Sequence, residues 1–175
     1  MKCQAKWRMG GLAAYTGLGA TIKDNVVKAD LTADSEAKTT LNVGGLVGET
    51  ATVTFTGNTS EGTLSATKGG SDDLNVGGIV GCSSASGTVT ISGCSVKADI
   101  NGTHTNRTAI FVGVASKGTD TVQQVYTLGT SSSACKVISG TKVNGTAVTQ
   151  LIDDLLVGSA KNRAVTKTNV SIVTE

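Results

Sequence analysis

Residues 43–48 read VGGLVG, and residues 76–81 repeat them as VGGIVG, 33 positions further along the chain. The match extends upstream, because Leu-Asn precedes both copies. An earlier copy, MGGLAA, occupies residues 9–14, and a decayed fourth copy, AIFVG, occupies residues 109–113. Periods of this length indicate a repeat architecture in which each unit buries its apolar face against the next.

The rest of each unit repeats as well, in two further segments. The first is a Thr-rich alternation at residues 20–23, 52–56, 88–92 and 121–123. The second reads NVVKADL at 25–31, NTSEGTL at 58–64 and CSVKADI at 94–100, with QVYTL at 124–128 as a weak fourth version. With the glycine run, each unit therefore offers three short β candidates. Asn25, Asn58 and Cys94 share one position, which predicts a stacked ladder at a corner.

Alternation at period two points one residue set inward and the other outward. The inward set predicted for the core is Leu31, Leu46, Val53, Phe55, Leu64, Ile79, Val89, Ile91 and Ile100. Thr (27), Gly (23) and Val (20) dominate the composition, and Pro is absent. Thr and Val are β-branched and favour strands over helices.

These features predict an all-β fold, a parallel right-handed β-helix of about four to five coils. A propeller, a leucine-rich repeat and an antiparallel sandwich fit the spacing less well. We expect residues 1–130 to form the β-helix, with repeats near 9–42, 43–75, 76–108 and 109–130. Residues 131–175 should add a last coil and a C-terminal cap. Polar loops at 33–40, 68–73 and 101–108 should project on one side.

Both ends of the predicted solenoid need cover, because an open end exposes backbone donors and acceptors. Apolar residues at 148, 151, 152, 155 and 156 have helical spacing and predict a short capping helix, with Gly158 as its C-cap. Residues 169–173 read as a final strand. At the other end the chain opens inside its first repeat, which predicts a contact with upstream coils of a longer chain or with another chain.

The glycine run, the Thr/Ile alternation and the Asn or Cys corner together resemble the GLUG-type repeat over residues 9–128. That repeat occurs in bacterial surface adhesins and lipoproteins, commonly of Bacteroides-like bacteria. The resemblance implies an exported, extracellular or cell-surface protein with a glycan or a surface protein as its partner. It supplies no catalytic residue.

The charge balance is nearly neutral, with 15 basic and 13 acidic residues, and this gives no case for nucleic acid as a partner. No segment reaches the roughly 18 apolar residues that a membrane helix needs. We expect no metal or cofactor, because His104 is the only histidine and Cys3, Cys82, Cys94 and Cys135 lack a C-x-x-C spacing. Cys94 is interpreted as a small buried residue of the corner ladder, and a disulfide from Cys82 to Cys94 is the alternative.

Five charged residues of the third segment are expected on one outward strip: Lys28, Asp30, Glu61, Lys97 and Asp99. We interpret this strip as a candidate ligand surface on a non-enzymatic adhesion or scaffold module. A solvated face whose charges suppress aggregation is the simpler interpretation. A fragment of a β-helical carbohydrate-active enzyme is a further alternative. Ice binding by the threonines is another, although Lys23 and Gln123 interrupt the predicted array.

Overall fold

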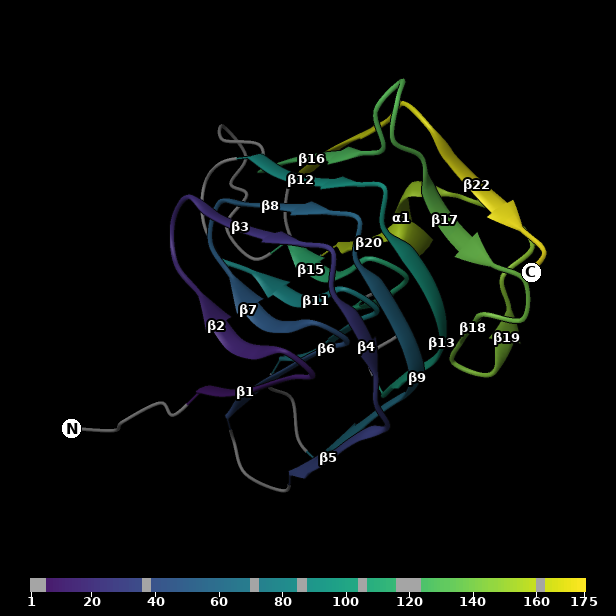
Figure 1. Ribbon diagram of the computed structural model, residues 1–175. Helices are drawn as coiled ribbons and strands as arrows, with labels where there is room; N and C mark the ends of the chain where they lie inside the picture. The colour runs from purple at the N-terminus through teal and green to yellow at the C-terminus, as the bar shows by residue number, and fades with distance from the viewer. Residues whose placement is uncertain are drawn as a thin grey trace.

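The computed structural model describes residues 6–35, 39–69, 73–84, 88–103, 107–115, 124–159 and 163–175. The chain is nearly all β and forms a parallel β-solenoid of about four turns with one short helix (Figure 1). The repeats stack directly on one another, as the 33-residue period predicts. The amide of Leu46 donates to the carbonyl of Ile79, one turn further on, at 3.1 Å.

Four sheets, A to D, run along the solenoid. Sheet A contains β1 (Lys6–Gly10), β6 (Thr40–Gly44), β10 (Leu74–Gly77) and β14 (Thr108–Ala109). Sheet B contains β2 (Ala13–Thr16), β7 (Val47–Thr50), β11 (Val80–Ser83), β15 (Val112–Ala115) and β20 (Val157–Ser159). Sheet C contains β3 (Ala20–Lys23), β8 (Val53–Thr56), β12 (Thr88–Ser92), β16 (Gln124–Leu128) and β21 (Arg163–Lys167). Sheet D contains β4 (Val26–Lys28), β5 (Leu31–Ser35), β9 (Thr59–Lys68), β13 (Ser95–Gly102), β17 (Cys135–Ile138), β18 (Lys142–Val143), β19 (Thr146–Ala147) and β22 (Val170–Val173).

The glycine run is a bend between two strands, so the expectation of three strands per unit is wrong. β6 ends at Gly44, Gly45 and Leu46 form the bend, and β7 begins at Val47. Two adjacent glycines let the backbone turn sharply where a side chain would collide: a Cβ on Gly45 would lie 2.1 Å from the Gly78 carbonyl oxygen. A full turn therefore contains four strands.

The last glycine of the run has a separate role, because it lets sheets A and B pack backbone against backbone. A Cβ on Gly81 in β11 would lie 2.6 Å from the Val43 amide nitrogen in β6. Gly48 meets Met9 in the same way, and Gly113 meets Val76. Each contact joins a sheet B strand to the sheet A strand of the preceding turn. The repeat therefore keeps glycine at this position to bring the two sheets together.

The stacking register follows the sequence repeat over the first three units. Lys28 pairs with Glu61 and Glu61 with Lys97, as the alignment of the third segment predicts. The fourth unit differs, because β16 pairs with β12 in sheet C and not with the third segment. The assignment of 124–128 to the third segment is therefore wrong, and β17 and β18 occupy that place. Residues 121–123 lie outside the described residues.

The core fills the solenoid with the predicted inward residues. All nine are buried except Leu31, which is partly buried against the same cluster. The corner ladder also forms, since the Asn25 side-chain amide donates to the Asn58 Oδ1 at 2.9 Å and Asn58 donates to the Cys94 sulfur at 3.8 Å. The turn that begins at β14 continues through β17 and β18, past residue 130.

The C-terminal residues add part of a further turn. The hairpin of β18 and β19 turns at Asn144 and Gly145, both at positive φ, and β22 pairs with β17 as the final strand. The predicted helix is only α1 (Asp153–Leu156), and β20 follows at once, so Gly158 lies in a strand and is not a C-cap. The carbonyls of Leu155 and Leu156 accept backbone hydrogen bonds from Ile110 and Phe111. These bonds continue the hydrogen-bond ladder that joins the A–B bends of successive turns.

Candidate functional site

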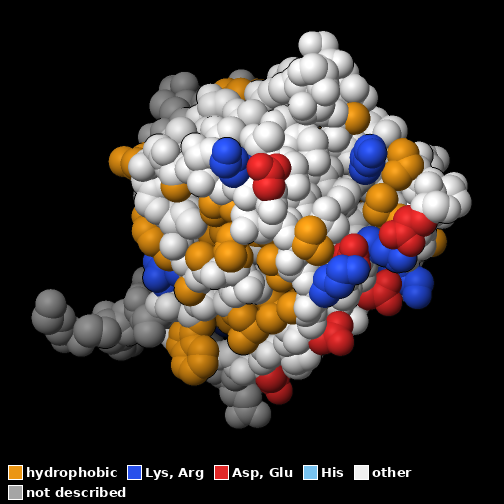
Figure 2. Space-filling model, in the orientation of Figure 1, with side chains coloured by type: hydrophobic (Ala, Val, Ile, Leu, Met, Phe, Trp, Pro, Cys, Tyr) orange, Lys and Arg blue, Asp and Glu red, His pale blue; other side chains and the backbone are white. Residues whose placement is uncertain are grey.

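The structure brings the five predicted strip residues together on the outer side of sheet D. Lys28 ends β4, Asp30 follows it, Glu61 lies in β9, and Lys97 and Asp99 lie in β13. They line two adjoining depressions of about 370 and 260 Å³, which share Glu61 and Gly62. Charged side chains of both signs gather on this side of the molecule, at the right of Figure 2.

The two depressions form where the backbone of sheet D departs from regular strand geometry. Gly62 has a φ of +116°, in the region that favours glycine, and a Cβ there would lie 2.4 Å from the Ala29 carbonyl oxygen. The first-turn strand is interrupted at the same level, between β4 and β5. In the fourth turn the chain leaves the sheet between β17 and β18, where Ser139 and Gly140 form the rim of the larger depression.

The charges of the strip are paired. Lys28 lies 2.9 Å from Glu61, Lys142 lies 3.6 Å from Asp99, and Lys97 contacts Glu175. Asp30 accepts a 2.7 Å hydrogen bond from the Thr63 amide. The hydrogen bond and the charge of Glu61 raise the pKa of Lys28. Because ammonium donors alternate with carboxylate acceptors, the depressions can contact a ligand rich in hydroxyl groups.

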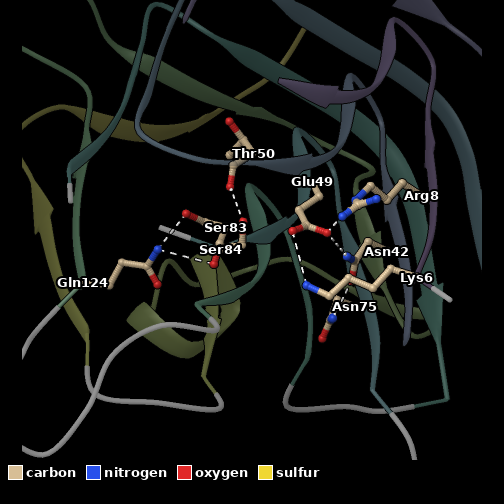
Figure 3. Close-up of polar contacts among 9 residues, drawn as sticks. All are labelled: Lys6, Arg8, Asn42, Glu49, Thr50, Asn75, Ser83, Ser84 and Gln124. Carbon is tan, nitrogen blue, oxygen red and sulfur yellow. Dashed lines mark hydrogen bonds and ion pairs between the residues drawn. The ribbon is translucent and has the colours of Figure 1, made fainter. Parts of the chain in front are cut away.

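A second polar cluster, centred on a buried carboxylate between sheets A and B, was not predicted from the sequence. Its centre is Glu49 in β7 (Figure 3), and the Glu49 residue is only 2 % exposed. Arg8 Nε donates to the Glu49 carboxylate at 2.7 Å, Asn42 Nδ2 donates at 3.0 Å, and Lys6 Nζ lies at 3.4 Å. We call Lys6, Arg8, Asn42 and Glu49 the Glu49 cluster.

Sheet A extends this cluster into a column. Asn75 donates to Asn42 at 2.6 Å, and Arg107 donates to Asn75 at 3.4 Å, so an arginine stands at each end of an asparagine pair. The signal was present in the sequence, since Asn recurs at one phase of the repeat with Arg in the first and fourth copies. The recurrence alone does not predict a buried polar cluster, because the carboxylate that Arg8 and Asn42 bind is Glu49 of a different strand. The column joins successive turns and satisfies a buried carboxylate.

We expect Glu49→Gln to lower the free energy of unfolding by about 1.5–3 kcal/mol at neutral pH, as for lost hydrogen bonds to a charged group. Burial alone would raise the pKa of Glu49, but hydrogen bonds from Arg8 and Ser84 and the charges of Lys6 and Arg8 lower it overall. A depressed folded-state pKa stabilises the fold above the unfolded pKa of about 4.3, and this contribution is lost as the pH falls through the folded value.

Urea unfolding of Glu49→Gln and wild type across a pH series measures this contribution. The stability difference should be constant near neutrality and shrink below about pH 4. Glu61→Gln is the matched control, because Glu61 forms an exposed pair, for which a small effect is expected. A difference that grows on acidification would contradict the assignment.

The described cysteines are buried, and the structure supports the interpretation of Cys94 as a small buried residue of the corner ladder. Cys82, Cys94 and Cys135 are buried, and no disulfide joins Cys82 to Cys94, so that alternative is not formed. Burial raises the pKa of Cys94, and it raises the pKa of Cys135 to about 11, which keeps both thiols protonated and unreactive at neutral pH. His104 and Cys3 lie outside the described residues.

The described residues offer neither a metal site nor a membrane-spanning helix. They contain no group of three or more His, Cys, Asp or Glu side chains placed to hold a metal ion. None of the helices in this part of the chain is long and apolar enough to cross a membrane.

Comparisons with known proteins add no identification. Models of known protein families, curated proteins and solved structures were all compared with the chain, and none of them matches it. A proposal for the function must therefore be argued from the fold, the sheet D strip and the Glu49 cluster.

Proposed function

We propose that this chain is a non-enzymatic, surface-exposed adhesion or scaffold module that binds glycan or protein through the sheet D strip. One observation carries the proposal: Lys28, Glu61 and Lys97 stand in register across three turns, and with Asp30 and Asp99 they line two adjoining depressions. The resemblance to GLUG-type repeats supports an extracellular or cell-surface location and a bacterial source.

The depressions suit binding better than catalysis. Their described lining has no histidine or cysteine, and its carboxylates Asp30, Glu61 and Asp99 are already engaged by the Thr63 amide, Lys28 and Lys142. A polar ligand would exchange hydrogen bonds with the paired ammonium and carboxylate groups, which the strand register already holds in place. A glycan fits this chemistry because each hydroxyl group both donates and accepts.

Two alternatives each have one supporting observation. Glu61, Lys97 and Asp99 line a single depression, the kind of cluster that a β-helical carbohydrate-active enzyme requires. Ice binding is favoured by one column of threonines on sheet C, and the pairing of β16 places Thr127 in it where Gln123 was expected. The column consists of Thr21, Thr54, Thr90, Thr127 and Thr166.

A glycan array and a panel of surface proteins, probed with the labelled chain, test the proposal. Lys97→Ala should weaken a detected interaction about tenfold, the effect of losing one charge-assisted hydrogen bond. Lys136→Ala is the control, because this exposed lysine of β17 removes the same charge from sheet D outside the lining of either depression.

Binding that Lys97→Ala reduces and Lys136→Ala preserves supports the strip as a ligand surface. Turnover of an oligosaccharide in a parallel lyase and hydrolase screen would defeat the non-enzymatic proposal in favour of an enzyme. Freezing hysteresis abolished by Thr90→Lys would favour ice binding. Ligand binding that is indifferent to both lysines, or no binding, would overturn the role of the strip.

A further inference from the structure

The exposed large hydrophobic side chains of the described residues all lie at the two ends of the solenoid. Five belong to the first turn and two to the last: Trp7, Leu12, Tyr15, Leu18 and Val26, then Ile152 and Ile172. Figure 2 looks onto the end formed by the first turn and shows hydrophobic side chains gathered across it. The turns between the ends bury theirs, so the exposure is a property of the ends.

The first turn exposes positions that belong to the core. Trp7 stands in register with Leu41, and Leu41 with Leu74, yet Trp7 is 56 % exposed and Leu41 only 2 %. Leu12 occupies the bend position of Leu46 and is 47 % exposed, while Leu46 is fully buried. Beside Trp7 a pocket of about 240 Å³ opens between β1 and β5. This end is therefore an opened core.

The strand edges at the two ends are complementary. In the described part of the chain, β1 to β5 have partner strands on one side only, and so do β20, β21 and β22 at the opposite end. Every pair between successive turns is parallel, so strands of sheets B, C and D run in matching directions at both ends. Unpaired edges of this kind are templates for another chain.

We propose that copies of this chain stack head to tail, with the last turn (α1, β20, β21 and β22) of one copy on the first turn (β1–β5) of the next. The contact continues the turn-on-turn packing already present inside each copy. It covers the apolar side chains of both ends and extends sheets B, C and D across the junction. Because the contact is heterologous and does not close, repeated stacking gives filaments.

Ala14 favours a second copy over a regular coil at this end. It occupies the position of Gly48, Gly81 and Gly113, where a Cβ collides with the sheet A strand of the preceding turn. A regular coil stacked on the first turn would place such a strand against Ala14. The last turn of a second copy has α1 in place of a sheet A strand, so it would place this helix, and not such a strand, against Ala14.

Cover of the apolar ends favours head-to-tail over head-to-head contact. Head-to-head contact of two first turns would leave Ile152 and Ile172 uncovered, whereas head-to-tail stacking covers exposed hydrophobic side chains of both ends. Charge does not select between the two, because Lys6 and Arg8 already pair with Glu49, and Asp153 and Asp154 already pair with Lys167 and Arg163.

Sedimentation of the intact chain with one end blocked tests the assembly. Wild type should form oligomers that grow with concentration. Leu12→Lys combined with Leu18→Lys blocks the first turn, and Ile172→Lys blocks the last. Each blocked variant should be monomeric alone, and an equimolar mixture should give dimers, because each supplies the end that the other lacks. Circular dichroism confirms that the variants are folded.

A cysteine pair tests the register, in a background with Cys3→Ser. Thr21 and Thr166 are the ends of one sheet C column, so Thr21→Cys on one copy and Thr166→Cys on another should form an intermolecular disulfide under oxidised glutathione. Thr54→Cys, from the middle of the column, should not cross-link to Thr166→Cys. A monomer at every concentration, or a dimer that survives Ile172→Lys, would overturn the proposal.

Discussion

Ile79→Asp is expected to unfold the chain. Ile79 is fully buried at the A–B bend and bonds through its carbonyl to Leu46 of the preceding turn. Removing a buried isoleucine side chain costs about 2–5 kcal/mol, and burying an unpaired carboxylate in its place adds several more. That sum is comparable with the whole stability of a domain, which is about 5–15 kcal/mol. Circular dichroism and thermal melting measure the result.

Matched substitutions separate this effect from general sensitivity. Ile79→Val keeps the site apolar and should lose only about 0.5–1.5 kcal/mol. Ile91→Asp should behave like Ile79→Asp, because Ile91 is fully buried in β12, whereas Thr88→Asp on the exposed side of the same strand should remain folded. An unchanged melting temperature for either isoleucine variant would contradict the inward placement.

Gly81→Val should be the second most damaging change, for a steric reason. The first atom of any side chain at Gly81 would lie 2.6 Å from the Val43 amide nitrogen and 2.6 Å from the Gly48 carbonyl oxygen. Val43 lies in sheet A and Gly48 in the neighbouring strand of sheet B, so sheets A and B must separate and β11 must shift against β7 to relieve both contacts. We expect a loss of about 3 kcal/mol or more in the free energy of unfolding, at the upper end of overpacking effects.

Gly17→Ala supplies the control, because a Cβ there meets no heavy atom within 4 Å. Chemical denaturation of Gly81→Ala, Gly81→Val and Gly17→Ala should rank the three, with Gly17→Ala near wild type. A Gly81→Ala protein as stable as the Gly17→Ala protein would show that sheets A and B are not in backbone contact at this point.

The sequence by itself determined the stacking direction, the register and the core, because these follow from repetition. Equivalent residues 33 positions apart pair in parallel, as Lys28, Glu61 and Lys97 do, and alternation at period two places the inward side chains. The five strip residues could be placed together for the same reason. Where the repeat decays, the prediction failed, so residues 124–128 were assigned to the wrong sheet.

Tertiary structure alone decided features that depend on contacts between positions that are not equivalent in the repeat. VGGLVG has an apolar pattern typical of a strand, and only the backbone contact of sheets A and B makes Gly45 and Leu46 a bend. Glutamate does not recur at the equivalent position of the other repeats, so the bonds of Glu49 to Arg8 and Asn42 could not be deduced from spacing. Helical spacing before Leu156 was overridden because the parallel pairing of β20 with β15 continues sheet B. The repeat spacing predicts which equivalent residues pair between turns. It does not predict contacts between different positions of the repeat, because these depend on how the side chains and backbone pack in three dimensions.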